Sequence, residues 1–178
     1  MILQLARAFT MSHAVPSDLE LPFIIPTRKS VSNSTSEPAT RSWPIQVFFW
    51  LWASPATLLG LGVGVVGLCT GGSARRVGAT VEFYGGAVTR LLQSRLFQAR
   101  GMTLGHVILG VSGPTLETIR PHEWVHVRQY ERWGPLFIPA YLGWCVVLWV
   151  AGRQPYWENP FEVEAYEADR KRESEAGE

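Results

Sequence analysis

Histidine and cysteine are scarce in this chain, and the scarcity limits the chemistry that it can carry. The 178 residues include only four histidines and two cysteines. Cys69 and Cys145 each lie in or at the end of an apolar run, with no other cysteine or histidine nearby. This placement favours packing against lipid or protein over a disulfide or a thiolate metal site.

A surplus of charge of one sign is also missing. Lys and Arg total 16 against 15 for Asp and Glu, so no basic excess points to binding of a nucleic acid. Two long stretches, Ile45 to Cys69 and Gly134 to Gly152, carry no charged side chain at all. This concentration of apolar residues suggests a membrane rather than an ordinary soluble core, so we expect membrane lipid as a partner.

The first 42 residues lack any persistent helical or strand period. Ser, Thr, Pro and Asn dominate residues 30–44, so residues 1–42 are predicted to be a disordered N-terminal segment. The apolar start is too short for a signal peptide and has no basic region before it, and Met11 is an alternative to Met1 as the true start.

The uncharged run Ile45–Cys69 predicts one transmembrane helix over residues 43–70, because about 20 apolar residues span the hydrocarbon of a bilayer. Pro55 should kink this helix. Gly60 and Gly64 should let another helix approach closely. Lysines and arginines are balanced on the two sides, so the orientation stays open.

Residues 76–172 are predicted to form an α+β domain in which a small antiparallel sheet precedes two helices. Thr80–Tyr84 and Val88–Leu92 are predicted strands, and Met102–Val111 has the clearest alternation. His106 lies on an otherwise apolar face of this last strand. It is either a packed structural histidine or one that supports a ligand or a substrate.

The most informative stretch is the sequence H-E-x-x-H, formed by His122, Glu123 and His126. Two histidines four residues apart share one face of a helix and can hold one Zn²⁺. The glutamate between them can act as general base toward a metal-bound water. The motif therefore predicts zinc as the cofactor, with His122 and His126 as ligands and Glu123 as the catalytic residue.

The motif helix is predicted to run from His122 to Trp133. Pro121 suits its start, because a proline at the first helical position loses no hydrogen bond, and Gly134-Pro135 suits its end. Gln129 falls on or near the metal face, where it either orients a ligand or is a surface amide.

A catalytic zinc site usually has three protein ligands, so a third is needed. Asn159-Pro160 is a good start for a second, carboxylate-rich helix, which a tail at residues 173–178 follows. The helical wheel leaves both Glu162 and Glu164 open as ligands. The alternative is that these carboxylates form a solvent-exposed acidic face of the helix and bind no metal.

The two stretches His122-Glu123-x-x-His126-Val127-x-Gln129 and Glu162-x-Glu164-Ala165-Tyr166 together resemble the core of a gluzincin-type zinc metallopeptidase. The resemblance implies a third ligand from a glutamate within E-x-x-A-D on a later helix. Glu162 is then the first choice and Glu164 the alternative, while Tyr166 stands where the aspartate would be. Residues 102–166 are more specifically similar to a group of small bacterial membrane proteins, which implies the bacterial inner membrane.

A shared metal also constrains topology, because Glu162 and the histidines must lie on the same side of a membrane. A single crossing by residues 134–152 would separate them. This segment is therefore predicted to be an interfacial or packed apolar helix.

These patterns together predict a membrane-anchored zinc metallopeptidase that hydrolyses peptide bonds. The strand Met102–Val111 would offer its edge to a peptide or protein substrate. Tyr166 and His106 are candidates for stabilising the oxyanion. The alternatives are a non-catalytic membrane protein with a structural or vestigial metal site, and a membrane-anchored binding module that uses the acidic tail.

Overall fold

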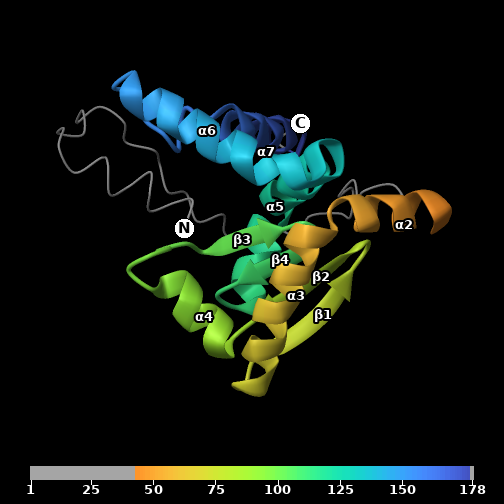
Figure 1. Ribbon diagram of the computed structural model, residues 1–178. Coiled ribbons are helices and arrows are strands. Elements are labelled where there is room, and N and C mark those ends of the chain that lie inside the picture. Colours follow the sequence, from red (N-terminus) through yellow and green to blue (C-terminus); the bar gives the residue numbers. More distant parts are fainter. Residues whose placement is uncertain (1–42, 177–178) are drawn as a thin grey trace.

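The computed structural model of the chain describes residues 43–176, so the predicted disordered segment and the last two residues lie outside the described part. The fold is α+β, as predicted (Figure 1). Its elements are α2 (Trp43–Trp52), α3 (Ser54–Cys69), β1 (Ser73–Val77), β2 (Thr80–Tyr84), α4 (Gly86–Gln93), β3 (Gly101–Leu104), β4 (Val107–Gly110), α5 (Gly113–Trp133), η1 (Gly134–Leu136), α6 (Phe137–Val150) and α7 (Pro160–Ala176).

The sheet is mixed, with the strand order β1-β2-β4-β3, so the prediction of an antiparallel sheet is wrong for its central pair. β1 pairs with β2 and β3 with β4 in antiparallel fashion, whereas β2 and β4 run parallel. A parallel pair needs a crossover between its strands, and α4 lies in that crossover. The predicted strand Val88–Leu92 belongs to α4. Its two buried residues, Val88 and Leu92, are one helical turn apart.

The predicted strand Met102–Val111 is in fact the hairpin β3–β4. Gly105 and His106 form its two-residue turn, and Gly105 has a φ of +62° that favours glycine. Leu104 pairs with Val107 across the turn. Alternation that continues through a two-residue turn cannot be distinguished from one longer strand in the sequence alone.

Helices cover both faces of the sheet (Figure 1). On one face, α3 and α4 pack over an apolar core that contains Phe83, Val107 and Leu109. On the other, α5 packs through Leu116 and Trp124 against Ile108. The motif helix α5 is thus held directly on the sheet.

The predicted transmembrane helix consists of two helices, α2 and α3, bent by 82° where they meet. Pro55 lies in the first turn of α3, so the break occurs where the proline was expected to disturb the helix. By length and composition, the run Gly113–Val150 is long and apolar enough to cross a membrane, and the bent pair would be a second candidate.

Gly60 and Gly64 of α3 pack against the sheet, and not against another helix as predicted. A Cβ atom added to Gly60 would lie 2.8 Å from Cβ of Val107 in β4. One added to Gly64 would lie 2.5 Å from the ring of Phe83 in β2. These glycines let α3 lie closer to the strands than any larger residue would allow.

Gly64→Ala is therefore expected to destabilise the fold by about 1–3 kcal/mol, because the new methyl overlaps the Phe83 ring. Gly62→Ala is the matched control, since nothing lies within 4 Å of its added Cβ. It should be neutral or slightly stabilising, because alanine favours the helix. Urea unfolding of both variants measures the difference, and equal stabilities would contradict the packing of α3.

The motif helix α5 begins earlier than predicted, at Gly113. Ser112 caps it by accepting a hydrogen bond from the backbone N–H of Thr115 at 3.3 Å. Pro121 consequently lies inside the helix and not at its start. The end is as predicted: Gly134, at φ +54°, terminates the helix after Trp133.

The second predicted helix is α7, and Asn159 caps it as expected. Asn159 is fully buried, and its Oδ1 accepts a hydrogen bond from the N–H of Phe161 at 3.1 Å. The helix continues through most of the predicted tail, to Ala176. The cap fixes the direction in which Glu162, in the first turn, leaves the backbone.

Candidate metal centre

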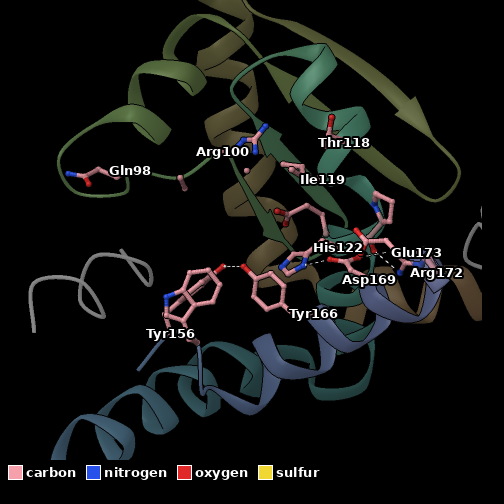
Figure 2. Close-up of a pocket in the computed structure, with 15 residues that line it drawn as sticks. Gln98, Arg100, Thr118, Ile119, His122, Tyr156, Tyr166, Asp169, Arg172 and Glu173 are labelled. Carbon is pink, nitrogen blue, oxygen red and sulfur yellow. Dashed lines mark hydrogen bonds and ion pairs between the residues drawn. The ribbon is translucent and has the colours of Figure 1, made fainter. Parts of the chain in front are cut away.

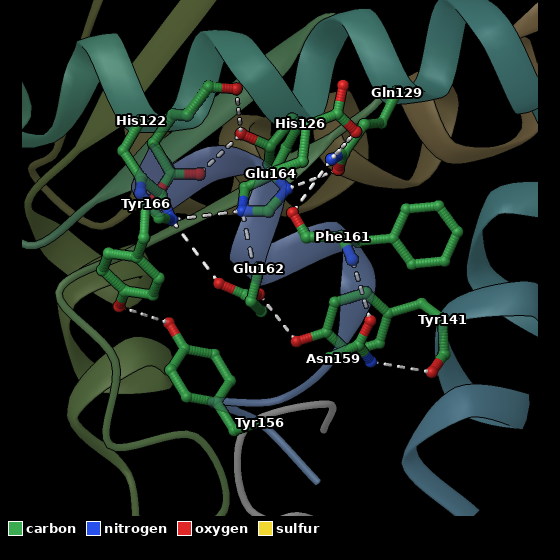
Figure 3. A network of polar contacts seen from close by, with 12 residues as sticks. His122, His126, Gln129, Tyr141, Tyr156, Asn159, Phe161, Glu162, Glu164 and Tyr166 are labelled. Atoms are coloured by element: carbon green, nitrogen blue, oxygen red, sulfur yellow. Dashed lines mark hydrogen bonds and ion pairs between the residues drawn. The ribbon is translucent and has the colours of Figure 1, made fainter. Parts of the chain in front are cut away.

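The three side chains predicted as first-choice ligands converge on one point (Figure 3). His122 and His126 come from α5, and their Nε2 atoms are 3.3 Å apart. Glu162 comes from α7. Its Oε2 lies 3.5 Å from Nε2 of His122, and its Oε1 lies 3.7 Å from Nε2 of His126.

This spacing suits a zinc ion. Tetrahedral ligands at about 2.0–2.1 Å from zinc lie about 3.3–3.4 Å from one another. Oε2 of Glu162 is buried and has no hydrogen-bond partner among residues 43–176, whereas its Oε1 accepts a hydrogen bond from Tyr141 Oη at 2.7 Å. A buried acceptor without a partner is costly unless a cation satisfies it. The two imidazoles and this carboxylate oxygen could therefore hold a metal ion.

A chain of hydrogen bonds fixes the tautomer of His126. The side-chain amide of Gln129 donates to the carbonyl of Phe161 and to Glu164 Oε2, both at 2.9 Å. Its oxygen must then face His126, whose Nδ1 donates to it at 2.8 Å. The proton is thus on Nδ1, and the lone pair of Nε2 points toward the metal position.

Asp169 fixes the ring of His122 in the same way. Its Oδ2 accepts from Nδ1 of His122 at 2.9 Å, and Arg172 holds its Oδ1 at 3.0 Å. Glu162, Tyr166 and Asp169 follow one another at intervals of about one helical turn. The carboxylate that the E-x-x-A-D pattern places at position 166 is thus supplied one turn later.

The charges of the site support each other. Burial alone would lower the pKa of His122, but its hydrogen bond to Asp169 and the carboxylate of Glu162, 3.5 Å away, raise this pKa to about 10. Burial would raise the pKa of Glu162, but the nearby imidazole of His122, that of His126 and the hydrogen bond from the Tyr141 hydroxyl together lower it. The metal-free site thus keeps Glu162 ionised and His122 in its protonated, cationic form. A bound metal would displace the second proton of His122.

Asp169→Asn is expected to weaken metal binding, tested with zinc, about 10–100-fold, the usual effect of removing a carboxylate that supports a metal-ligating histidine. The change leaves all three ligands in place and removes the negative charge beside His122. Glu173→Gln is the matched control, because Glu173 is on the same helix as Asp169 and lines the same surface cleft, which is described next. Competition with a chromophoric chelator measures both affinities, and equal affinities would rule out the supporting role of Asp169.

Glu123 lies beside the three ligand side chains, on a cleft that opens to solvent. Its Oε2 accepts a hydrogen bond from Thr103 Oγ1 at 2.6 Å. An inner cavity of about 80 Å³ is lined by all three ligand residues, and an outer cleft of about 480 Å³ adjoins it. Both are lined by Gly101, His122, Glu123 and Tyr156. Figure 2 shows Tyr156 and Tyr166 on one side of the cleft, with His122 at its centre.

The alternative ligand Glu164 points elsewhere. It accepts hydrogen bonds from Gln129 at 2.9 Å and from Arg132 at 3.3 Å. It therefore contacts the site through Gln129. Gln129 in turn orients His126, which is the first of the two roles predicted for this amide.

The two candidates for stabilising an oxyanion differ in position. Tyr166 packs on the ring of His122, with centroids 4.8 Å apart, and its hydroxyl lies 3.1 Å from that of Tyr156. His106 lines neither cavity. It is fully buried, and its Nε2 lies 3.3 Å from a carboxylate oxygen of Glu131 in α5. The structural role of His106 is the one that this geometry supports.

No family model, curated protein or solved structure matches this chain. The gluzincin resemblance therefore depends on the motif residues and their geometry alone.

Four residues of the site were not identified from the sequence: Thr103, Tyr141, Tyr156 and Asp169. Asp169 had a signal, because it lies on the same helical stripe as Glu162. Tyr141 lies in an apolar helix and Thr103 in a strand, where nothing in the local pattern distinguishes them. Their roles depend on contacts between segments far apart in the chain.

Proposed function

We propose that this protein is a zinc-dependent peptidase with a gluzincin-like centre. The observation that carries the proposal is the convergence of His122, His126 and Glu162, with the carboxylate of Glu123 beside them on an open cleft. Zn²⁺ held by the three side chains would polarise a peptide carbonyl and lower the pKa of a water toward about 7.

Glu123 is the proposed general base. Thr103 donates to its Oε2, which orients the carboxylate and leaves Oε1 to accept a proton from the attacking water. Glu123 would then pass this proton to the leaving amine. Because Thr103 belongs to β3, the strand that borders the cleft also sets the position of the base.

β3 is an edge strand of the sheet and is well placed to bind an extended substrate. Gly101, Met102 and Thr103 line the inner cavity. A peptide added along this edge would run past Glu123 and the ligand residues. Gly101 lets Ile119 and Glu123 approach this strand closely, since a Cβ at this position would overlap Cδ1 of Ile119 and lie 3.0 Å from Glu123 Oε1.

The hydroxyl pair of Tyr156 and Tyr166 is the proposed donor to the oxyanion. Two phenols that share one hydrogen bond retain one O–H that can donate to a third group. Burial raises the pKa of Tyr156, so that its hydroxyl stays protonated at neutral pH. This arrangement extends the predicted role of Tyr166 to a pair, and it does not include His106.

A purely structural zinc site is the rival function. Structural sites usually close the metal with four protein ligands, whereas catalytic ones use three and leave a position for water. Among the described residues the group has three ligands, which favours catalysis.

Digestion of a peptide library tests the proposal. The full chain, purified in detergent, should cleave peptides, lose this activity with a zinc chelator and regain it when zinc is restored. Cleavage that continues without metal, or no cleavage by zinc-loaded protein across the library, would contradict a zinc peptidase. We further propose the bacterial inner membrane as its location, on the basis of the resemblance and the apolar surface described next.

A further inference from the structure

Exposed apolar side chains gather on three helices, α2, α3 and α6. Among the residues that the structure describes, all exposed large hydrophobic residues except Leu96, Trp133 and Trp157 belong to these helices or to η1. The members are Trp43, Ile45, Val47, Phe48, Leu51, Trp52, Leu58, Leu59, Val65, Val66, Leu68, Leu136, Trp144, Val146, Val147, Trp149 and Val150. We call this set the apolar surface. Surfaces of this extent mark contact with a membrane or another protein.

We propose that the apolar surface lies in one leaflet of a lipid bilayer, and that residues 43–176 do not cross the membrane. This attachment differs from the transmembrane helix predicted from the sequence. It does not depend on the proposed peptidase activity.

The packing of α3 argues against a crossing. Thr57 accepts a hydrogen bond from the backbone N–H of His106 at 3.2 Å, and Gly60, Gly64 and Gly67 contact the sheet and α4 further along. A helix held on a sheet over its whole length would carry that sheet into the hydrocarbon. There the open edge strands β1 and β3 would leave backbone N–H and C=O groups without partners.

Charges on the sheet add to this argument. Glu82, in β2, is fully buried and forms ion pairs at 2.6 Å with Arg75 of β1 and Arg120 of α5. The adjacent Arg76 lies on the same edge strand. Charged side chains at the centre of a bilayer are expensive, so the sheet belongs outside the hydrocarbon.

The lengths of the apolar helices also argue against a crossing of the membrane. α3 has 16 residues and α6 has 14, so neither helix reaches across a hydrocarbon layer of about 30 Å at about 1.5 Å per residue. The 82° bend prevents α2 from extending α3 into a straight span. Within the candidate span Gly113–Val150, α5 carries charged side chains and the candidate metal ligands and packs on the sheet, which leaves α6 as the apolar part.

Lipid suits the composition of the apolar surface. No charged residue occurs from Trp43 to Ala74 or from Trp133 to Gly152, and tryptophans are frequent in both segments, as at a membrane interface. α2 exposes Trp43, Phe48 and Leu51 around much of its circumference, and such an apolar helix is unfavourable in water. The segments adjoin, because Ala53 and Ala56 share one core with Phe137 and Tyr141 of α6.

Protease accessibility in sealed vesicles tests the topology. The full chain would carry one epitope tag at each terminus and be reconstituted into vesicles of phosphatidylethanolamine and phosphatidylglycerol. Attachment to one leaflet predicts that an impermeant protease removes both tags from the same side. Tags protected on opposite sides would show a crossing and overturn the proposal.

Charge substitutions test the surface itself. Leu58→Glu with Val65→Glu places two carboxylates on the outer face of α3 and should reduce the affinity for vesicles about 100-fold or more. Leu96→Glu is the matched control at an exposed apolar residue outside the surface and should bind as the parent does. Far-ultraviolet circular dichroism of the released variant should match that of the parent. Vesicle binding that is unchanged in the double variant, or a parent that forms a soluble dimer and ignores vesicles, would overturn the proposal.

Discussion

Replacing Glu123 by Gln is expected to lower the rate of peptide hydrolysis by at least about 10²–10⁴-fold while zinc stays bound. The amide cannot accept the proton of the attacking water, and a positioned general base contributes a factor of this size. Glu123 is not among the three side chains that converge on the metal position. Thr103 can still donate to the amide oxygen, so the local structure should survive. Steady-state rates and zinc content of the purified variant measure the two effects separately.

Glu117→Gln is the control for this substitution. Glu117 is an exposed glutamate on the same helix, and its partner is Arg75 at 3.1 Å. It should leave the rate unchanged. Full activity of Glu123→Gln would rule out the proposed mechanism. Loss of zinc from Glu123→Gln would instead show that Glu123 contributes to metal binding.

Glu162→Ala should abolish stoichiometric zinc binding, with a loss of affinity greater than about 100-fold. A ligand should cost more than the roughly 10–100-fold that a supporting residue costs. The change also leaves the buried hydroxyl of Tyr141 without its acceptor, which is expected to destabilise the metal-free fold by about 1–3 kcal/mol. Zinc titration and thermal unfolding of the metal-free protein measure these two consequences.

Glu164→Ala is the matched control, since it removes the other candidate carboxylate from the same turn. Glu164 reaches the site only through Gln129, so its loss should weaken zinc binding by no more than about tenfold. The reverse result, with zinc lost from Glu164→Ala and kept by Glu162→Ala, would show that the wrong glutamate has been assigned as the ligand.

The sequence predicted the parts of the site that depend on local spacing. H-E-x-x-H specified which imidazoles share a helical face, and Asn159-Pro160 specified where the second helix begins. The choice between Glu162 and Glu164 could not follow from a helical wheel, because both flank the apolar stripe. It is decided by Arg132 and Gln129, which hold Glu164 away from the metal position.

The sheet was harder to predict, because its central pairing is not local. β2 and β4 are parallel neighbours separated by α4 and β3, and no short-range pattern specifies such a pair. The left-handed φ of Gly105 and the hairpin that it allows were not predicted. The alternation of side chains between two faces continued through the turn, so the sequence predicted one strand where there are two.

The first apolar run shows the limit of composition as a guide. Ile45–Cys69 has the length and the lack of charge of a transmembrane helix. The structure adds that its glycines lie against Val107 and Phe83, so that one face covers a sheet and the other is exposed. Lipid and a protein interior exclude charge alike, so composition could not separate them.

The most direct test of the metal centre is X-ray absorption at the zinc edge, together with metal analysis, on the full chain and on His126→Ala. The geometry predicts one zinc per chain, bound by two imidazole nitrogens and by oxygen at about 2.0–2.1 Å, and little zinc in the variant. Protein that binds no zinc, or whose zinc lacks two imidazole ligands, would contradict a metal centre at His122, His126 and Glu162.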